Sequence, residues 1–222
     1  MPYYVITEPE SIKDICDTWD QCKAKVAGVK GAKYQKVQDL EQAQAMLTGS
    51  GVVLSPGLHV FTDGNSLGGV GVVVAWMPDE PEADPTVVAE ISTSVGHVFY
   101  DGSIPGLNDR EKVEAALAQS RNILAELGGL YLALWQAPEH AKLSIVHDYE
   151  GVGKWMNEEW QIKDSVHQAV IVACKQLQES KNLDLTFVWQ KGHTSSWAGR
   201  HDLARLNARA DALATLGGKT GP

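Results

Sequence analysis

The spacing of apolar residues predicts a small first unit over residues 1–48. A strand is expected at 3–7, a helix at 10–26 with Ser11 as its cap, a second strand at 33–37 and a short closing helix at 41–47. Glycine, serine and proline then gather in the runs TGSG (48–51) and SPG (55–57). Such turn-forming residues interrupt helices and strands, so a linker is expected at 49–57.

A second unit is predicted over residues 58–217. The apolar pattern there predicts strands at 58–63, 70–76 and 87–99, a helix at 109–137 that could be broken, a strand at 143–148, a helix at 166–179, a strand at 185–190 and a final helix that ends at 217–218. Short turns between the first three strands favour antiparallel pairing. Strands first in a meander and then alternating with helices indicate an α/β fold, in which helices cover a mixed sheet.

The distribution of charge keeps nucleic-acid binding open. The net charge of −9 is unfavourable for binding phosphates, but one 14-residue window has no acidic residue and holds five lysines: Lys23, Lys25, Lys30, Lys33 and Lys36. A concentrated basic patch can hold phosphates although the rest of the chain is acidic. The alternative is an ordinary solvated lysine face, and the charge alone does not decide between the two.

The composition is that of a globular protein in a reducing compartment. Of the 222 residues, 44% are apolar and 21% are charged. No apolar run approaches the roughly 20 residues of a membrane-spanning helix, and the N-terminus lacks the pattern of a secretory signal. Cys16, Cys22 and Cys174 are an odd number without metal-binding or redox spacing. We expect a cytoplasmic protein that has no contact with a membrane.

Two aspartates close apolar strands in the same way. Asp63 follows Phe61 on one face of its strand, and Asp148 ends the apolar strand that contains Ile145 and Val146. If both strands are central in one sheet, the two carboxylates lie side by side, and a divalent cation is the usual remedy for their repulsion. The alternative for each is a surface turn, since Asp-Gly at 63–64 is a common turn sequence.

Two further carboxylates lie on predicted helices. Glu126 stands at the edge of the apolar stripe of the helix at 109–137, although a solvated glutamate is the alternative. Asp211 lies near the first turn of the final helix if Asn207 is its cap, and the helix dipole alone could explain an acid there. Four carboxylates without cysteine or clustered histidine favour Mg²⁺ or Mn²⁺ over zinc.

Together these residues resemble type 1 ribonuclease H over residues 58–217. The resemblance is carried by FTDG at 61–64, by Glu126 after Arg121-Asn122, by Asp148-Tyr149, and by KGH at 191–193 before NARAD at 207–211. It implies a ribonuclease H-like mixed five-stranded sheet flanked by helices. It also implies an endonuclease that acts as a monomer on the RNA strand of RNA–DNA hybrids and leaves 5′-phosphate and 3′-hydroxyl ends.

The first unit resembles the small α/β hybrid-binding domain, also called viroplasmin-like, that often precedes this nuclease. The runs YYV (3–5), WDQC (19–22) and VAGVKGAKYQK (26–36) carry the match. In that family an aromatic pair packs on the DNA backbone and lysines hold phosphates. These roles would fall on Tyr4, Trp19 and Lys36, with Lys33 as a helper, whereas a place in the core is the alternative for the two aromatic residues.

The resemblance also implies the roles within the catalytic unit. Two ions of Mg²⁺ or Mn²⁺ would be held by Asp63, Glu126, Asp148 and Asp211, with Asp202 as a rival to Asp211. His193 would carry protons or assist product release. Gly64, Asn65 and Asn122 are candidates for contacts with RNA 2′-hydroxyl groups. A hybrid-binding protein without cleavage, or another nuclease on the same fold such as a junction resolvase or an integrase-like enzyme, remains the alternative.

Overall fold

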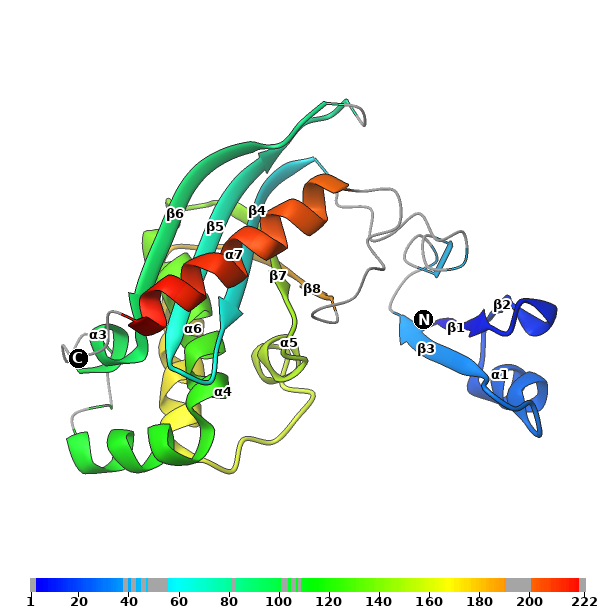
Figure 1. Ribbon diagram of the computed structural model, residues 1–222, viewed down its shortest axis with the longest axis horizontal. Coiled ribbons are helices and arrows are strands. Elements are labelled where there is room, and N and C mark those ends of the chain that lie inside the picture. The colour runs from blue at the N-terminus through cyan, green and yellow to red at the C-terminus, as the bar shows by residue number, and fades with distance from the viewer. Residues whose placement is uncertain are drawn as a thin grey trace. The chain divides into compact units, whose positions relative to one another are not determined.

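The computed structural model divides the chain into two compact units (Figure 1). One consists of Met1–Leu54 with His193–Ala204, and the other of Ser55–Gly192 with Arg205–Pro222. The structure describes residues 3–37, 40, 43–44, 47, 56–80, 83–100, 104, 107, 109–190 and 201–219, with only the backbone at 201 and 202. In this described part, no helix combines the length and the apolar character needed to cross a bilayer.

The first unit contains a three-stranded antiparallel sheet in the order β2-β1-β3. Its elements are β1 (Tyr3–Glu8), a 3-10 turn η1 (Glu10–Ile12), β2 (Asp14–Cys16), α1 (Trp19–Val26) and β3 (Lys33–Val37). The strands predicted at 3–7 and 33–37 are confirmed.

The single helix predicted at 10–26 is wrong. Residues 14–16 pair with β1 instead, and Thr18 rather than Ser11 caps the shorter helix, since its hydroxyl accepts a hydrogen bond from Gln21 N at 3.3 Å. Of the closing helix predicted at 41–47, residues 43, 44 and 47 are helical and the others lie outside the described residues. The linker predicted at 49–57 falls almost entirely outside them too.

Each face of the small sheet carries its own apolar cluster. Ile6, Cys16 and Cys22 form one cluster with α1, and Val5, Val37 and Ala43 form the other. Successive residues of a strand point to opposite faces, so Val5 and Ile6 fall in different clusters. Burial on both faces gives this short unit a core of its own.

The second unit contains a mixed five-stranded sheet in the order β6-β5-β4-β7-β8. Its strands are β4 (Gly57–Gly64), β5 (Gly69–Met77), β6 (Thr86–Ser94), β7 (Lys142–His147) and β8 (Asp184–Trp189). The first three pair antiparallel, and β7 is parallel to both β4 and β8. The predicted fold class, a mixed five-stranded sheet flanked by helices and preceded by a small α/β unit, is confirmed.

The helices of this unit depart from the predictions at several ends. They are α3 (Val95–Phe99), α4 (Arg110–Gln136), α5 (Gly151–Met156), α6 (Ser165–Ser180) and α7 (His201–Lys219). The strand predicted at 87–99 stops at Ser94, whose hydroxyl caps α3. The expected break in the helix at 109–137 is a kink at Ser120 (φ −146°, ψ 43°). The start of the final helix near Asn207 is wrong, because α7 already begins at His201.

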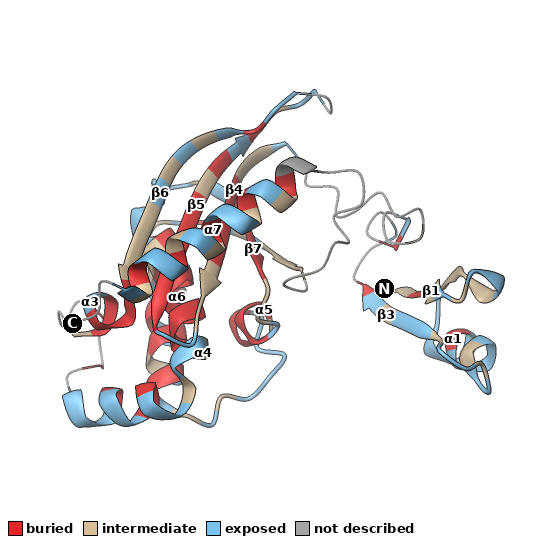
Figure 2. Cartoon of the chain, viewed as in Figure 1, coloured by how far each residue is buried: buried red, intermediate tan, exposed pale blue. Residues whose placement is uncertain are grey.

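Helices cover both faces of the five-stranded sheet, with α7 on one face and α4 and α6 on the other (Figure 1). Two successive residues of β5, which point to opposite faces, show this arrangement. Val70 lies against Gly128 of α4, whereas a Cβ atom on Gly71 would lie 2.0 Å from Ala210 O of α7. Buried residues line the central strands and the inner side of α4 (Figure 2), so the core of this unit lies between the sheet and the layer of α4 and α6.

Candidate active site

The sheet register brings Asp63 and Asp148 together. Strands β4 and β7 are parallel neighbours, and the pair Phe61–Val146 is the last in register. Asp63 and Asp148 each lie two residues further along the chain, at the same end of the sheet. The prediction that two adjacent strands place Asp63 and Asp148 side by side is therefore confirmed.

Glu126 joins them from α4. Its side chain is only 4% exposed, and Oε1 accepts a hydrogen bond from Gly64 N at 2.9 Å. The approach requires glycine at 64, because a Cβ atom there would lie 2.4 Å from Glu126 N. Oε2 of Glu126 is buried and has no hydrogen-bond donor among the described residues. A buried carboxylate oxygen without a donor is costly, so a cation is the natural partner.

Asp211 approaches from the opposite helical layer. Asp63 is paired in register with Gly71, and α7 packs directly on the backbone of Gly71 through Ala210. The side chain of Asp211 thereby lies near enough to Asp63 to raise the pKa of that carboxyl group, although the group of oxygens within 4.8 Å of one another comprises only Asp63, Glu126 and Asp148. Asp211 does not lie in the first turn, since α7 begins at His201, so the helix-dipole explanation for this acid is wrong.

Burial and the neighbouring carboxylates raise the pKa of Asp63 and of Glu126. Asp63, Glu126 and Asp148 each offer an oxygen within 4.8 Å of the others. Burial, with added repulsion from Asp148 and Asp211, raises the pKa of Asp63 to about 7. Burial and the charges of Asp148 and Asp63 raise the pKa of Glu126 well above its ordinary value. Among the described residues, no lysine or arginine forms an ion pair with any of the four acids. A site with this excess of negative charge fits divalent cations.

The candidate contacts to ribose lie close in sequence to Asp63 and Glu126. The Oδ1 atom of Asn65 accepts hydrogen bonds from Leu67 N and Gly69 N, both at 3.0 Å, so it is already used to shape the loop after β4. Asn122 is exposed and lies four residues before Glu126 on α4, hence on the same side of the helix. His193 and the side chain of Asp202 lie outside the described residues.

The first unit presents an aromatic row. The rings of Tyr4 and Trp19 have centroids 5.5 Å apart, and those of Trp19 and Tyr34 are 5.3 Å apart. Trp19 and Tyr34 are 37% and 47% exposed, so neither is a core residue. Tyr34 is not among the residues predicted from the sequence to bind a hybrid. The available signal was its spacing, because Tyr34 lies two residues before Lys36 on one strand and so shares its face.

The lysines of the window without acidic residues differ in whether they already pair with an acid. Lys33 pairs with Glu8 at 2.9 Å and Lys25 pairs with Asp14, so both are partly neutralised. Lys36 is exposed, is paired in register with Tyr4, and forms no ion pair within the described residues. The structure thus brings Tyr4, Trp19 and Lys36 to one face, whereas Lys33 is held by an acid.

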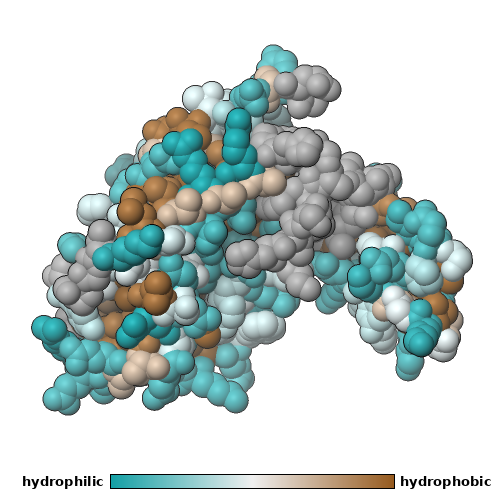
Figure 3. All heavy atoms as spheres, viewed as in Figure 1, coloured by the Kyte–Doolittle hydropathy of each residue, from teal (hydrophilic) through white to brown (hydrophobic). Residues whose placement is uncertain are grey.

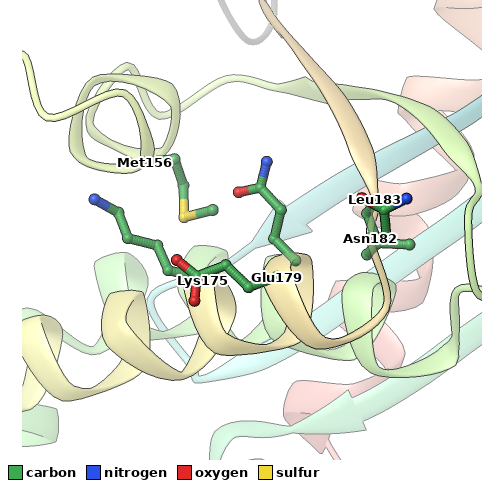
Figure 4. A pocket seen from close by; sticks show the side chains of 6 residues that line it. Met156, Lys175, Glu179, Asn182 and Leu183 are labelled. Carbon is green, nitrogen blue, oxygen red and sulfur yellow. The ribbon is translucent and has the colours of Figure 1, made fainter.

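A pocket of about 390 Å³ lies elsewhere in the second unit (Figure 4). Met156 at the end of α5 and Lys175 and Glu179 on α6 line it, together with Gln178, Asn182 and Leu183. Lys175 is engaged with Glu158 at 2.5 Å. None of the candidate site residues lines this pocket, and the carboxylate cluster remains the candidate site.

The surface drawn in Figure 3 is largely hydrophilic. Large apolar side chains are nonetheless exposed in this unit, with Leu67 at 63% in the loop between β4 and β5 and Val88 at 60% on the edge strand β6. Exposed apolar side chains of this kind are usual for a globular protein.

Comparison with known families supports the resemblance of the first unit. Residues 2–47 match the family described as the ribonuclease H1 N-terminal domain. No curated protein sequence matches the chain.

Several solved ribonucleases H are similar in structure. Ribonuclease H1 from the archaeon Halobacterium salinarum is 20% identical, with 74% of this chain and 98% of that chain covered and a TM-score of 0.45. The N-terminal ribonuclease H domain of a Mycobacterium tuberculosis protein, fused to maltose-binding protein, is 21% identical, with coverage of 71% and 99% and a TM-score of 0.42. A ribonuclease H1 isolated from compost is 15% identical, with coverage of 74% and 97% and a TM-score of 0.46. Likeness at this level does not extend to activity.

Proposed function

We propose that the chain is a metal-dependent endonuclease that hydrolyses the RNA strand of RNA–DNA hybrids and leaves 5′-phosphate and 3′-hydroxyl ends. The observation that carries this proposal is the meeting of Asp63, Glu126 and Asp148 at one end of the central strands, with Asp211 against Asp63. The match of residues 2–47 to the ribonuclease H1 N-terminal domain supports a hybrid as the substrate.

The donor set fits two ions of Mg²⁺ or Mn²⁺. All four side chains offer oxygen, and Glu126 Oε2 is a buried oxygen without a donor among the described residues. When bound, such ions supply activation of a water molecule and stabilisation of the leaving 3′ oxygen. Asp63, Glu126, Asp148 and Asp211 would hold them.

The other candidate residues would bind and orient the hybrid. Tyr4 and Trp19 would pack on the DNA backbone while Lys36 holds a phosphate, with Lys33 contributing once it leaves Glu8. Asn122 and the backbone at Gly64 and Asn65 would contact RNA 2′-hydroxyl groups, which distinguish RNA from DNA. His193 would carry protons during the reaction, and the protein would act as a monomer.

A protein that binds hybrids without cutting them is the main alternative. The carboxylate cluster argues against it, because binding alone gives no reason to bury Glu126 beside two aspartates. Another nuclease on the same fold would not need the N-terminal unit that residues 2–47 match.

Incubation with labelled substrates tests the proposal. The full chain is given an RNA–DNA hybrid, an RNA duplex and a DNA duplex, each with EDTA, Mg²⁺ or Mn²⁺. We expect cleavage of the RNA strand of the hybrid alone, and only with a metal ion. Binding of the hybrid without cleavage in any metal would support the alternative, and cleavage of a DNA duplex would indicate a different nuclease.

A further inference from the structure

The backbone that follows Asp148 is held by an unusual set of hydrogen bonds. Strand β7 ends at His147, which is the last residue in register with β8, where its partner is Trp189. Beyond this pair no further residue of β8 continues the ladder, so the carbonyl groups that follow would lack ladder donors. Each of them nevertheless accepts a hydrogen bond.

Three consecutive carbonyl groups accept hydrogen bonds from the end of β8 and from the ring of His147, and the third, that of Tyr149, also accepts one from Val152 N at 3.0 Å. The carbonyl of His147 accepts from Gln190 N at 2.9 Å. That of Asp148 accepts from the indole Nε1 of Trp189 at 2.9 Å. The carbonyl of Tyr149 lies 3.0 Å from Nδ1 of His147, and a carbonyl can only accept, so Nδ1 carries the proton.

The ring of His147 serves this one hydrogen bond. It is 1% exposed, packs edge-on against Phe187 with centroids 6.1 Å apart, and its Nε2 has no partner among the described residues. Helix α5 closes over it at Gly153, where a Cβ atom would lie 3.2 Å from Nε2. A leucine would fill such a space without an unpaired polar atom, so the Nδ1 contact is the evident reason for histidine here.

These hydrogen bonds fix the backbone next to Asp148, whose carboxylate is repelled by its neighbours. The Asp148 carboxylate lies against Glu126 and Asp63, and the repulsion among the three would push a strand-end residue outward. Fixing the two peptide groups that follow Asp148 opposes that displacement before any cation is bound. Ligands that are held in place by neighbouring hydrogen bonds bind metal ions more tightly than free ones.

We infer that Trp189 and His147 are positioning residues for Asp148, which their ring N–H groups hold in the orientation that binds a divalent cation. This inference rests on the proposed function, since it takes Asp148 as a metal ligand. Neither residue belongs to the carboxylate cluster itself.

The test measures Mn²⁺ binding directly on the full chain, by calorimetry, alongside hybrid cleavage and thermal unfolding in EDTA. Trp189→Phe removes the indole N–H and keeps an aromatic ring. His147→Gln moves the donor away from the Nδ1 position, and His147→Asn keeps a donor near it. Trp135→Phe, at an exposed tryptophan near the end of α4, is the control for an indole lost elsewhere.

We expect Trp189→Phe and His147→Gln to weaken Mn²⁺ binding by about three- to tenfold, as the loss of one hydrogen bond predicts. His147→Asn should restore most of the affinity, and Trp135→Phe should leave it unchanged. Unchanged Mn²⁺ affinity in Trp189→Phe and His147→Gln, whatever their melting temperatures, would overturn the inference and leave the proposed function standing. A wild-type chain that binds Mn²⁺ but cuts no hybrid would overturn the proposed function alone, and one that binds no Mn²⁺ would overturn both.

Discussion

Asp63 shows how a single residue couples the site to stability. Its carboxyl group is placed by β4, fixed by the pair with Gly71, and surrounded by Asp148 and Asp211. A carboxylate in that position is unfavourable for folding in the absence of a cation and useful in its presence. A carboxylate that lowers the stability of the metal-free protein indicates a metal ligand, because selection for stability alone would favour a neutral side chain at that position.

Replacement of Asp63 by asparagine should abolish cleavage and stabilise the metal-free protein. The pKa of Asp63 is raised from 3.8 to about 7 in the folded state, so its contribution to stability is full below pH 4 and is lost as the pH rises through 7. In EDTA at pH 8 we expect Asp63→Asn to unfold with a free energy about 1–4 kcal/mol higher than wild type. Urea unfolding at pH 5 and pH 8 measures this.

The same experiment contains its control. Addition of Mg²⁺ should stabilise the wild type at pH 8 and have little effect on Asp63→Asn. Equal stability of the two proteins at pH 8 in EDTA would mean that Asp63 is not under electrostatic strain. Retained cleavage with Mg²⁺ would remove it from the metal ligands.

The two aspartates of α7 should differ in their effect on activity. Asp211 lies against Asp63, so Asp211→Asn should remove most cleavage, whereas Asp202→Asn should leave it largely intact. Cleavage of the hybrid by each variant is measured over a Mn²⁺ titration, because excess metal can partly rescue a weakened site. An inactive Asp202→Asn protein would show that the assignment of the fourth ligand is wrong.

At the scale of elements, the site depends on how closely α7 can approach the sheet. Glycines at 69 and 71 of β5 leave no side chain between strand and helix, and Gly217 lies equally close to Thr93 of β6. The hydroxyl of Ser92 donates to Leu213 O at 2.7 Å, and Arg209 pairs with Glu90. Asp211 therefore comes close to Asp63 because α7 packs directly on the glycine backbone of β5.

Addition of one methyl group at Gly71 should disrupt both packing and catalysis. A Cβ atom there would meet Ala210 O at 2.0 Å and Ala214 N at 2.6 Å, and neither backbone atom can move without the helix. We expect Gly71→Ala to cost about 1–3 kcal/mol and to reduce cleavage strongly. Melting temperature and cleavage rate are both measured.

Gly128→Ala is the matched control in α4. A Cβ atom at 128 would have its nearest contact at 3.5 Å, which is ordinary packing, and alanine favours a helix over glycine by about 1 kcal/mol. This variant should be active and at least as stable as wild type. If Gly71→Ala behaves like Gly128→Ala, the close approach of α7 is not needed for the site.

The sequence predicted the strands better than the helix ends, for physical reasons. Alternation and short turns define β4, β5 and β7, and these strands alone bring Asp63 and Asp148 together. The start of α7 could not be predicted, because Asn207 is a good cap by its chemistry and only packing on β5 shows that the helix begins earlier. The strand β2 was missed because three residues with mixed polarity gain their order from pairing with β1.

At the scale of the whole molecule, each unit has its own hydrophobic core. The large cluster around α4 and α6 contains only residues of the second unit, and the clusters around Val5 and Ile6 contain only residues of the first. We therefore expect that the proposed binding and cleavage can be separated by cutting the chain between the cores.

A protein that begins at Ser55 should still cut the hybrid but bind it more weakly. It lacks Tyr4, Trp19 and the lysine window, and each lost phosphate contact reduces the slope of binding against salt by roughly one unit. Affinity for the hybrid is measured for both proteins at several salt concentrations. Equal affinity and equal slope would show that the first unit does not bind the substrate.

The position of Asp211 on α7 has a consequence for the order in which the site is assembled. Asp63, Glu126 and Asp148 lie on β4, on α4 and just after β7, whereas Asp211 lies on a helix that follows all five strands of this sheet in the chain. Pairing of the strands alone would therefore leave the proposed site without its fourth carboxylate. Docking of α7 on β5 would be the step that completes the site.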